Sequence, residues 1–208
     1  MKKLLWSVLL LLFASGASAA CKNPQLSKDF LTRYETETQK WRVSDPYYYD
    51  DPKLGFSINL KTQGTTIDFY AFDLGMKKFE NGMTDQLLRQ SVSEMLQVMN
   101  YNETLPTSKP FLLPKSLFNG SDKYLVHKAV YVVQERKPKN IVSIVSVGYD
   151  GRCFQKLRFT KDLISKDIDI KNYFDNPTHD AETKASVLMF SGLVKILNEE
   201  LFRVGYYK

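Results

Sequence analysis

The stretch FSINLKTQGTTIDFYA, residues 56–71, decides the fold of this chain. Phe56, Ile58 and Leu60 alternate with polar residues, which is the period of a β-strand that buries one face. Gln63-Gly64 predicts a two-residue turn, because glycine readily adopts the positive φ that tight hairpin turns need. The cross-strand pairs that this turn predicts all join apolar or small residues: Phe56–Ala71, Ile58–Phe69 and Leu60–Ile67. One register that gathers all these residues on one side indicates an antiparallel sheet with a buried face.

A second group of strands is predicted over residues 124–160. Residues 124–133 and 141–149 are rich in the β-branched and aromatic side chains that strands favour. Asp150-Gly151 is a strong signal for another two-residue turn. We expect Cys153 on the core side of this hairpin, beside Gly148. The expected pairs are Val142–Phe159 and Ile144–Leu157 on the core side, and Ser143–Arg158 and Val145–Lys156 on the opposite side.

Helical spacing of apolar residues occurs in three segments, residues 24–42, 84–99 and 181–202. The clearest is the second, whose apolar residues build one stripe. Two prolines within residues 45–52 predict a loop before the first hairpin. The order helix, hairpin, helix, three strands, helix predicts an α+β fold in which helices flank an antiparallel β-sheet, as in an α/β/α sandwich.

This order of elements resembles the PsbP-like group of exported α/β/α sandwich proteins. The resemblance runs from the strand start Gly55-Phe56-Ser57-Ile58 through both hairpins to the closing helix, and covers most of residues 53–202. It includes no catalytic motif, and Lys61-Thr62 stands where those proteins often have Pro and Trp. The resemblance implies an accessory or binding protein rather than an enzyme.

The first 20 residues, MKKLLWSVLLLLFASGASAA, predict a cleaved signal peptide. Two lysines precede an apolar run over residues 4–13, and Ala17-Ser18-Ala19 forms an A-x-A cleavage site. The apolar run is shorter than the roughly 20 residues that span a bilayer, and no later stretch approaches that length. We therefore expect export to the bacterial periplasm, no transmembrane span, and one globular domain over residues 21–208.

Cleavage after Ala19 or Ala20 leaves Cys21 at or next to the new N-terminus. Two cysteines in an oxidising compartment usually pair, which predicts a disulfide between Cys21 and Cys153. The alternative is a lipoprotein, in which Cys21 carries a lipid anchor and Cys153 stays free. Ser18 stands where a lipobox usually has leucine, so the disulfide is the favoured interpretation.

Composition and motifs exclude several functions. Removing the leader takes away two lysines and no acids, so the net charge falls from +6 to a mild +4, which argues against nucleic acid as a partner. Neither G-x-S-x-G, nor S-x-x-K, nor a glycine-rich phosphate loop occurs. His127 and His179 lack the spacing of a zinc site, and residues 167–171 lack the glycine and ligand positions of a calcium loop. The sequence thus predicts no cofactor, no metal and no catalytic residue.

Two surface features are candidate binding sites. One is the acid-flanked cluster Tyr47, Tyr48 and Tyr49, because aromatic side chains are enriched in recognition surfaces. The alternative is that these tyrosines cover the core. The other feature is basic, and its alternative is an ordinary solvated sheet face and turn. It comprises Arg152, Lys156 and Arg158 on the last strand, with Arg136, Lys137 and Lys139 at a nearby hairpin end.

From these observations we expect an exported periplasmic protein without catalysis, which binds another envelope protein. One concrete version is an immunity-type inhibitor of a toxin delivered to the envelope. A first alternative is a hydrolase of envelope material, which would need two carboxyl groups converging in a cleft. A second is a small-ligand binder, which would need an apolar cavity between the sheet and the helices with a few polar groups converging on it.

Overall fold

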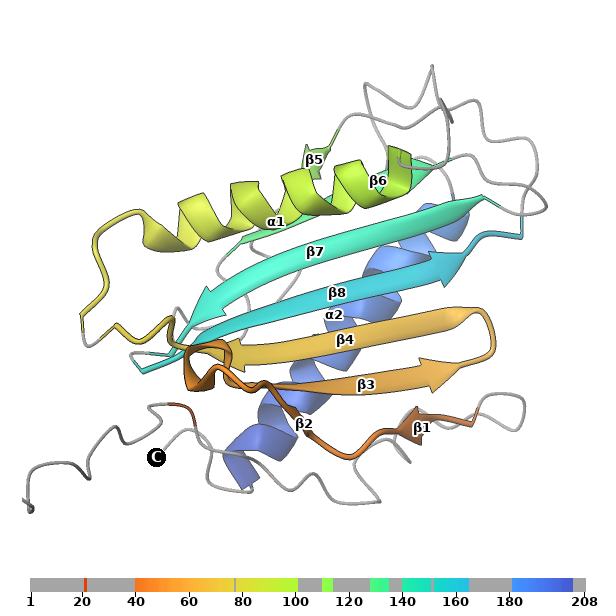
Figure 1. The fold of residues 1–208 in the computed structure, drawn as a ribbon. Helices are drawn as coiled ribbons and strands as arrows, with labels where there is room; N and C mark the ends of the chain where they lie inside the picture. Colours follow the sequence, from red (N-terminus) through yellow and green to blue (C-terminus); the bar gives the residue numbers. More distant parts are fainter. Residues whose placement is uncertain are drawn as a thin grey trace, which may run out of the picture.

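An eight-stranded antiparallel sheet forms the centre of the structure, a computed structural model (Figure 1). The residues that the structure describes are 21, 40–76, 78–100, 110–113, 128–134, 140–150, 152–164 and 181–203. The strand order is β1-β3-β4-β8-β7-β6-β5, and β2 also pairs with β3. The strands are β1 (Arg42–Val43), β2 (Tyr47–Tyr48), β3 (Phe56–Thr62), β4 (Thr65–Phe72), β5 (Phe111–Leu112), β6 (Lys128–Gln134), β7 (Ile141–Tyr149) and β8 (Phe154–Asp162).

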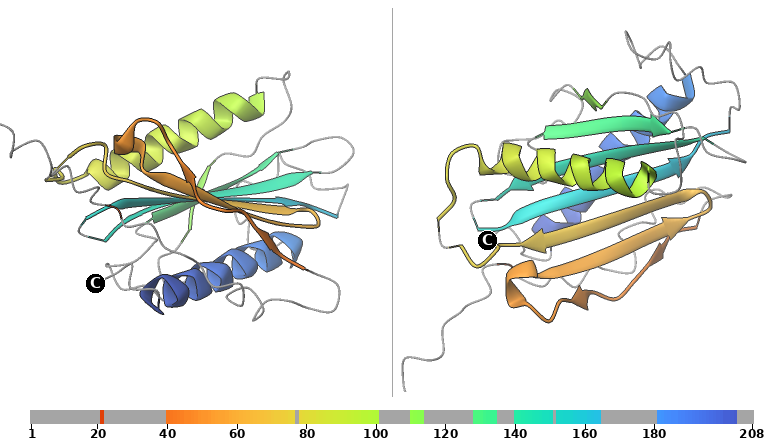
Figure 2. Two further views of the ribbon diagram at one scale, coloured as in Figure 1. Left: turned by 60° about the horizontal axis from the view of Figure 1, so that its bottom comes forward. Right: turned by 45° about the horizontal axis from the view of Figure 1, so that its top comes forward.

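Two long helices pack on opposite faces of this sheet. Helix α1 (Met83–Asn100) lies over β6 and β7, and α2 (Ala181–Arg203) crosses the other face. Figure 2 shows the sheet edge-on between the two helices. The predicted α+β fold, an antiparallel sheet with helices on both faces, is confirmed. Neither described helix is long and apolar enough to cross a membrane.

The first hairpin has the predicted register. Leu60 pairs with Ile67, Ile58 with Phe69 and Phe56 with Ala71, and all of these side chains are buried under α2. Gly64 in the turn has φ +70°, the conformation for which glycine was expected. The alternation of apolar and polar residues therefore sets this pairing correctly.

The second hairpin is shifted by two residues from the predicted register. Ile144 pairs with Phe159, and Gly148 pairs with Gln155 rather than lying beside Cys153. On the opposite side Val145 pairs with Arg158 and Val147 with Lys156. The prediction of a two-residue turn was wrong. The Asp150 carboxylate accepts hydrogen bonds from the backbone N–H groups of Arg152 and Cys153, and these bonds stabilise a longer loop. An even shift keeps every side chain on its predicted face.

Short elements around the first hairpin differ from the predicted helix and loop. Residues 24–39 of the predicted first helix lie outside the described residues, but Arg42–Val43 is strand β1, paired with Lys61 and Leu60. The predicted loop over residues 45–52 contains β2 and the start of a 3-10 helix, η2 (Pro52–Leu54). Pairing with the edge of β3 overrides local propensity at these positions.

The two faces of the sheet have different compositions. The face under α2 is mainly apolar, with buried Thr65, Ser146 and Gln155 as polar exceptions. Its core includes Phe69, Tyr131, Ile144 and Phe159, each at most 1% exposed. On the other face, α1 covers an apolar half formed by β6 and β7. Figure 1 shows that α1 leaves β4 and β3 uncovered on this face. Beside this uncovered half, β8 carries two of the residues that sequence reasoning proposed for binding, Lys156 and Arg158.

Candidate functional site

Two rows of side chains cross the uncovered half of the sheet. In one row Ser57 on β3 faces Tyr70 on β4, which faces Lys156 on β8. In the next row Asn59 faces Asp68, which faces Arg158. The registers of three neighbouring strands thus place polar and charged groups at adjacent positions, although they lie far apart in the sequence.

The tyrosine cluster joins this surface at its edge. The Tyr49 hydroxyl donates a hydrogen bond to Ser57 Oγ at 3.3 Å, which extends the first row by one side chain. Tyr47 and Tyr48 are 62% and 51% exposed, and the Tyr47 ring packs edge-on against that of Tyr49 at 5.2 Å between centroids. Tyr47 pairs with Ser57, so its exposed ring lies on this side of the sheet. Tyr48 pairs with Phe56 and its ring contacts that buried ring at 6.3 Å between centroids, so it lies on the face under α2.

Tyr70 and Lys156 form the centre of the surface. Lys156 Nζ lies over the Tyr70 ring at 4.8 Å from its centroid, which is a cation–π contact. Burial raises the pKa of Tyr70 to about 12, with a further contribution from the Asp68 carboxylate. Burial also lowers the pKa of Lys156, against the opposite influence of Glu94. Both groups are thus partly removed from water before any partner binds.

Helix α1 forms one wall of the surface and makes it a groove. Two adjoining hollows of about 300 and 230 Å³ share Tyr70, Ser91, Glu94 and Lys156 among their lining residues. Tyr49 lines the larger hollow and Arg158 the smaller. We call this site the polar groove, defined by Tyr49, Tyr70, Glu94, Lys156 and Arg158.

Two acids of this surface, Asp68 in the second row and Glu94 in the polar groove, each accept a hydrogen bond from a side-chain amide. Asp68 accepts a hydrogen bond from the Asn59 amide at 2.5 Å, and exposed Glu94 accepts one from the Gln90 amide at 3.0 Å.

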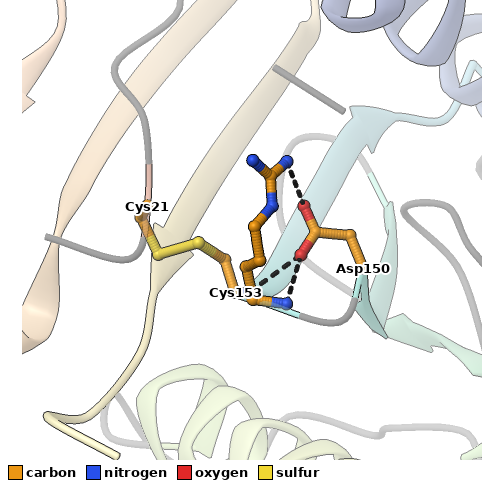
Figure 3. Close-up of polar contacts among 4 residues, drawn as sticks. Cys21, Asp150 and Cys153 are labelled. Carbon is orange, nitrogen blue, oxygen red and sulfur yellow. Dashed lines mark hydrogen bonds and ion pairs between the residues drawn. A yellow bond between two sulfur atoms is a disulfide. The ribbon is translucent and has the colours of Figure 1, made fainter. Parts of the chain in front are cut away.

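Not all the predicted basic residues join the groove. Lys156 and Arg158 do, whereas Arg152 lies in the β7–β8 loop, where its guanidinium is 3.6 Å from the buried Asp150 carboxylate. Figure 3 shows this contact next to the Cys21–Cys153 disulfide, whose Cα atoms are 5.5 Å apart. The grouping of Arg152 with the basic strand face was wrong, because the loop uses its charge locally. Arg136, Lys137 and Lys139 lie outside the described residues.

Sequence reasoning missed three residues of this surface, namely Asp68, Tyr70 and Glu94. A signal for the first two was present, because Thr66, Asp68 and Tyr70 alternate with the buried residues of β4 and must share its opposite face. Glu94 gave no such signal. Its place beside Lys156 depends on where α1 crosses the sheet.

An apolar pocket lies on the other side of α1, toward the opposite edge of the sheet. Its volume is about 770 Å³. The walls are mainly apolar side chains, and charged side chains also line it. The apolar residues are Leu88, Val92 and Leu96 of α1 with Pro110, Leu112 and Val130, and the charged ones are Asp85, Arg89 and Lys128.

No metal centre is formed by the described part of the chain, which brings no three His, Cys, Asp or Glu side chains together. Comparison with family models, with curated proteins and with solved structures finds no match to this chain. The resemblance to the PsbP-like group stays a prediction, and functional inference depends on the geometry of the two sites.

Proposed function

We propose that this chain is an exported protein of the bacterial envelope that binds another envelope protein through the polar groove and does not catalyse a reaction. The observation that carries the proposal is the ordered surface of Tyr49, Tyr70, Lys156 and Arg158 on an uncovered sheet face. Aromatic and arginine side chains in partly desolvated positions are the residues that contribute most to protein–protein binding.

The exposed ring of Tyr47 extends this surface. It lies at the sheet edge, where Tyr47 of β2 pairs with Ser57 of β3. A partner that covers the groove and this ring would bury aromatic area at little entropic cost, because a tyrosine side chain has only two rotatable angles. An immunity-type inhibitor, which blocks a toxin in the envelope, is one role that such a surface would serve.

The disulfide supports export. Disulfides persist in oxidising compartments such as the periplasm and are rare in the cytoplasm. Cys21 directly follows the predicted leader and is bonded to Cys153, and the same sulfur would be consumed by a lipid anchor. We therefore propose a periplasmic protein in which Cys21 is disulfide-bonded rather than lipidated.

Intact mass spectrometry of the native envelope protein tests the compartment. We expect a mass that corresponds to cleavage near Ala19 and lies two protons below that of the reduced form. A mass raised by diacylglycerol and acyl chains would contradict this assignment.

Photo-crosslinking in living cells tests the binding surface. A photo-reactive amino acid replaces Tyr47 in one variant and Leu188 of α2 in a control, because these side chains are 62% and 56% exposed. We expect a discrete crosslinked product from position 47 only, and its loss when Arg158→Glu is added. Equal products from both positions, or none at native abundance, would overturn the proposal.

A further inference from the structure

The apolar pocket is elongated along α1. Leu88, Val92 and Leu96 follow one another at intervals of four residues, so they form a continuous stripe about 12 Å long. Leu88 is buried, whereas Val92 and Leu96 are only partly buried. The facing wall comes from the other edge of the sheet, where Leu112 of β5 pairs with Val130 of β6 and is itself 56% exposed. A volume of about 770 Å³ falls within the range that small-molecule sites occupy.

The charged residues of the pocket lie at one end of this stripe. Asp85 and Arg89 belong to the first two turns of α1, and Lys128 is the first residue of β6. Lys128 Nζ contacts the Asp85 carboxylate at 2.6 Å, which fixes the start of β6 beside the start of α1. The formal charges of these three groups sum to one positive charge, and the positive end of the helix dipole is added to it. Among the described residues, the lining at the other end of the stripe is Leu96 with the polar but uncharged Gln97.

We propose that this pocket binds a long-chain carboxylate, with its alkyl chain along the α1 stripe and its carboxylate beside Arg89 and Lys128. A linear chain fits the apolar stripe along α1, and a single anionic group matches the net charge at its end. The arginine guanidinium presents two parallel N–H donors, the arrangement that binds both oxygens of a carboxylate. This site is separate from the polar groove and independent of the partner that binds there.

Fluorescence of cis-parinaric acid, which increases in an apolar environment, measures binding to the delipidated full-length mature protein. We expect saturable binding, displaced by dodecanoate and much less by butyrate. Each additional CH₂ that enters the pocket strengthens binding about threefold to fourfold. Absence of saturable binding, or equal displacement by both acids, would overturn the proposal without bearing on the polar groove.

One pair of variants tests the location of the site. Leu112→Glu places a charge in the apolar wall, and we expect it to weaken binding at least about tenfold. Leu188→Glu is the matched control, because Leu188 is also 56% exposed but lies on α2. Both positions are on the surface, and circular dichroism verifies that each variant folds. Equal effects of the two substitutions would contradict the location.

The headgroup is tested by a comparison of dodecanoate with dodecanol, which have the same chain and differ in charge. We expect Arg89→Gln to weaken dodecanoate binding about fivefold and to leave dodecanol unchanged. Lys184→Gln, an exposed charge on α2, should change neither. If Arg89→Gln leaves dodecanoate unchanged, or weakens both ligands equally, the carboxylate assignment is wrong.

Discussion

The two faces of the central sheet show how differently one set of strands can be used. On the face under α2, buried apolar residues extend from Phe56 on β3 to Tyr131 on β6. On the opposite face the same strands are apolar only on β6 and β7, at the start of β8 and at the end of β4, around α1. The remainder is polar and forms one wall of the polar groove. A helix thus covers apolar area, and a face left polar stays open for binding.

The contrast is sharpest within β8, where neighbouring residues belong to different faces. Leu157 and Phe159 are at most 1% exposed under α2, whereas Lys156 and Arg158 point into the groove. Because the side-chain period of a strand is two, one strand contributes at once to stability and to the candidate site. The following predictions use this alternation, from the largest expected effect to the smallest.

Phe159→Ala is expected to lower the free energy of unfolding by about 3–5 kcal/mol, because it removes a fully buried ring that packs against Phe190 of α2. Arg158→Ala, one residue away on the other face, should cost less than about 1 kcal/mol. Urea unfolding measures both. Similar losses for the two variants would mean that the faces do not differ in the way described.

Val147→Ala tests the half of the face that α1 covers. Val147 of β7 pairs with Lys156 of β8 and is fully buried. Its truncation should therefore lower the free energy of unfolding by about 2 kcal/mol. Lys156→Ala, its cross-strand partner in the groove, should cost under about 1 kcal/mol. Equal costs, again from urea midpoints, would place the boundary between the two halves elsewhere.

Gln155 is a polar exception on the face under α2. Its side chain is fully buried, and its amide has no hydrogen-bond partner among the described residues. Gln155→Met keeps the side-chain volume and removes the desolvated amide, so we expect the free energy of unfolding to rise by about 1 kcal/mol. Thermal or urea unfolding measures this change. The same change at exposed Gln90 should have almost no effect. A clear loss at position 155 would show that the amide has a partner.

The pH dependence of stability provides the smallest test. The folded-state pKa of Tyr70 is about 12, above its ordinary value of 10, so the folded protein keeps this proton when the unfolded chain has lost it. The contribution of Tyr70 is therefore complete below pH 10 and is lost as the pH rises toward 12. Tyr70→Phe should flatten the fall of the urea midpoint between pH 10 and 11.5. Tyr47→Phe, at an exposed position, should leave it unchanged.

The two hairpins separate what local sequence can predict from what it cannot. In β3–β4 the turn has the expected two residues and the register was correct. In β7–β8 the same type of turn signal was overridden, because Asp150 binds two backbone N–H groups and the disulfide holds Cys153. The predicted face of each β8 side chain was still correct, because a register shift of two residues leaves every side chain on the same face of the sheet.

Strands of two residues escaped prediction for a different reason. A segment as short as Tyr47–Tyr48 or Phe111–Leu112 contains no measurable period. Each exists because an edge strand, β3 or β6, offers unpaired backbone groups beside it. Both candidate sites lie beside these edges and combine residues from distant segments. The sequence therefore predicted some of their residues but not that they lie together.

The sequence by itself predicted the five long strands, the helices α1 and α2, the face to which each side chain of the long strands points, and, as the favoured alternative, the pairing of the two cysteines. These follow from local periodicity and from there being only two thiols. Only the tertiary structure decided that Tyr49, Tyr70, Glu94 and Lys156 meet in one groove. It also decided that an apolar pocket with charged residues at one end lies on the other side of α1. Strand order and the line along which a helix crosses a sheet depend on contacts between distant segments, which local patterns do not encode.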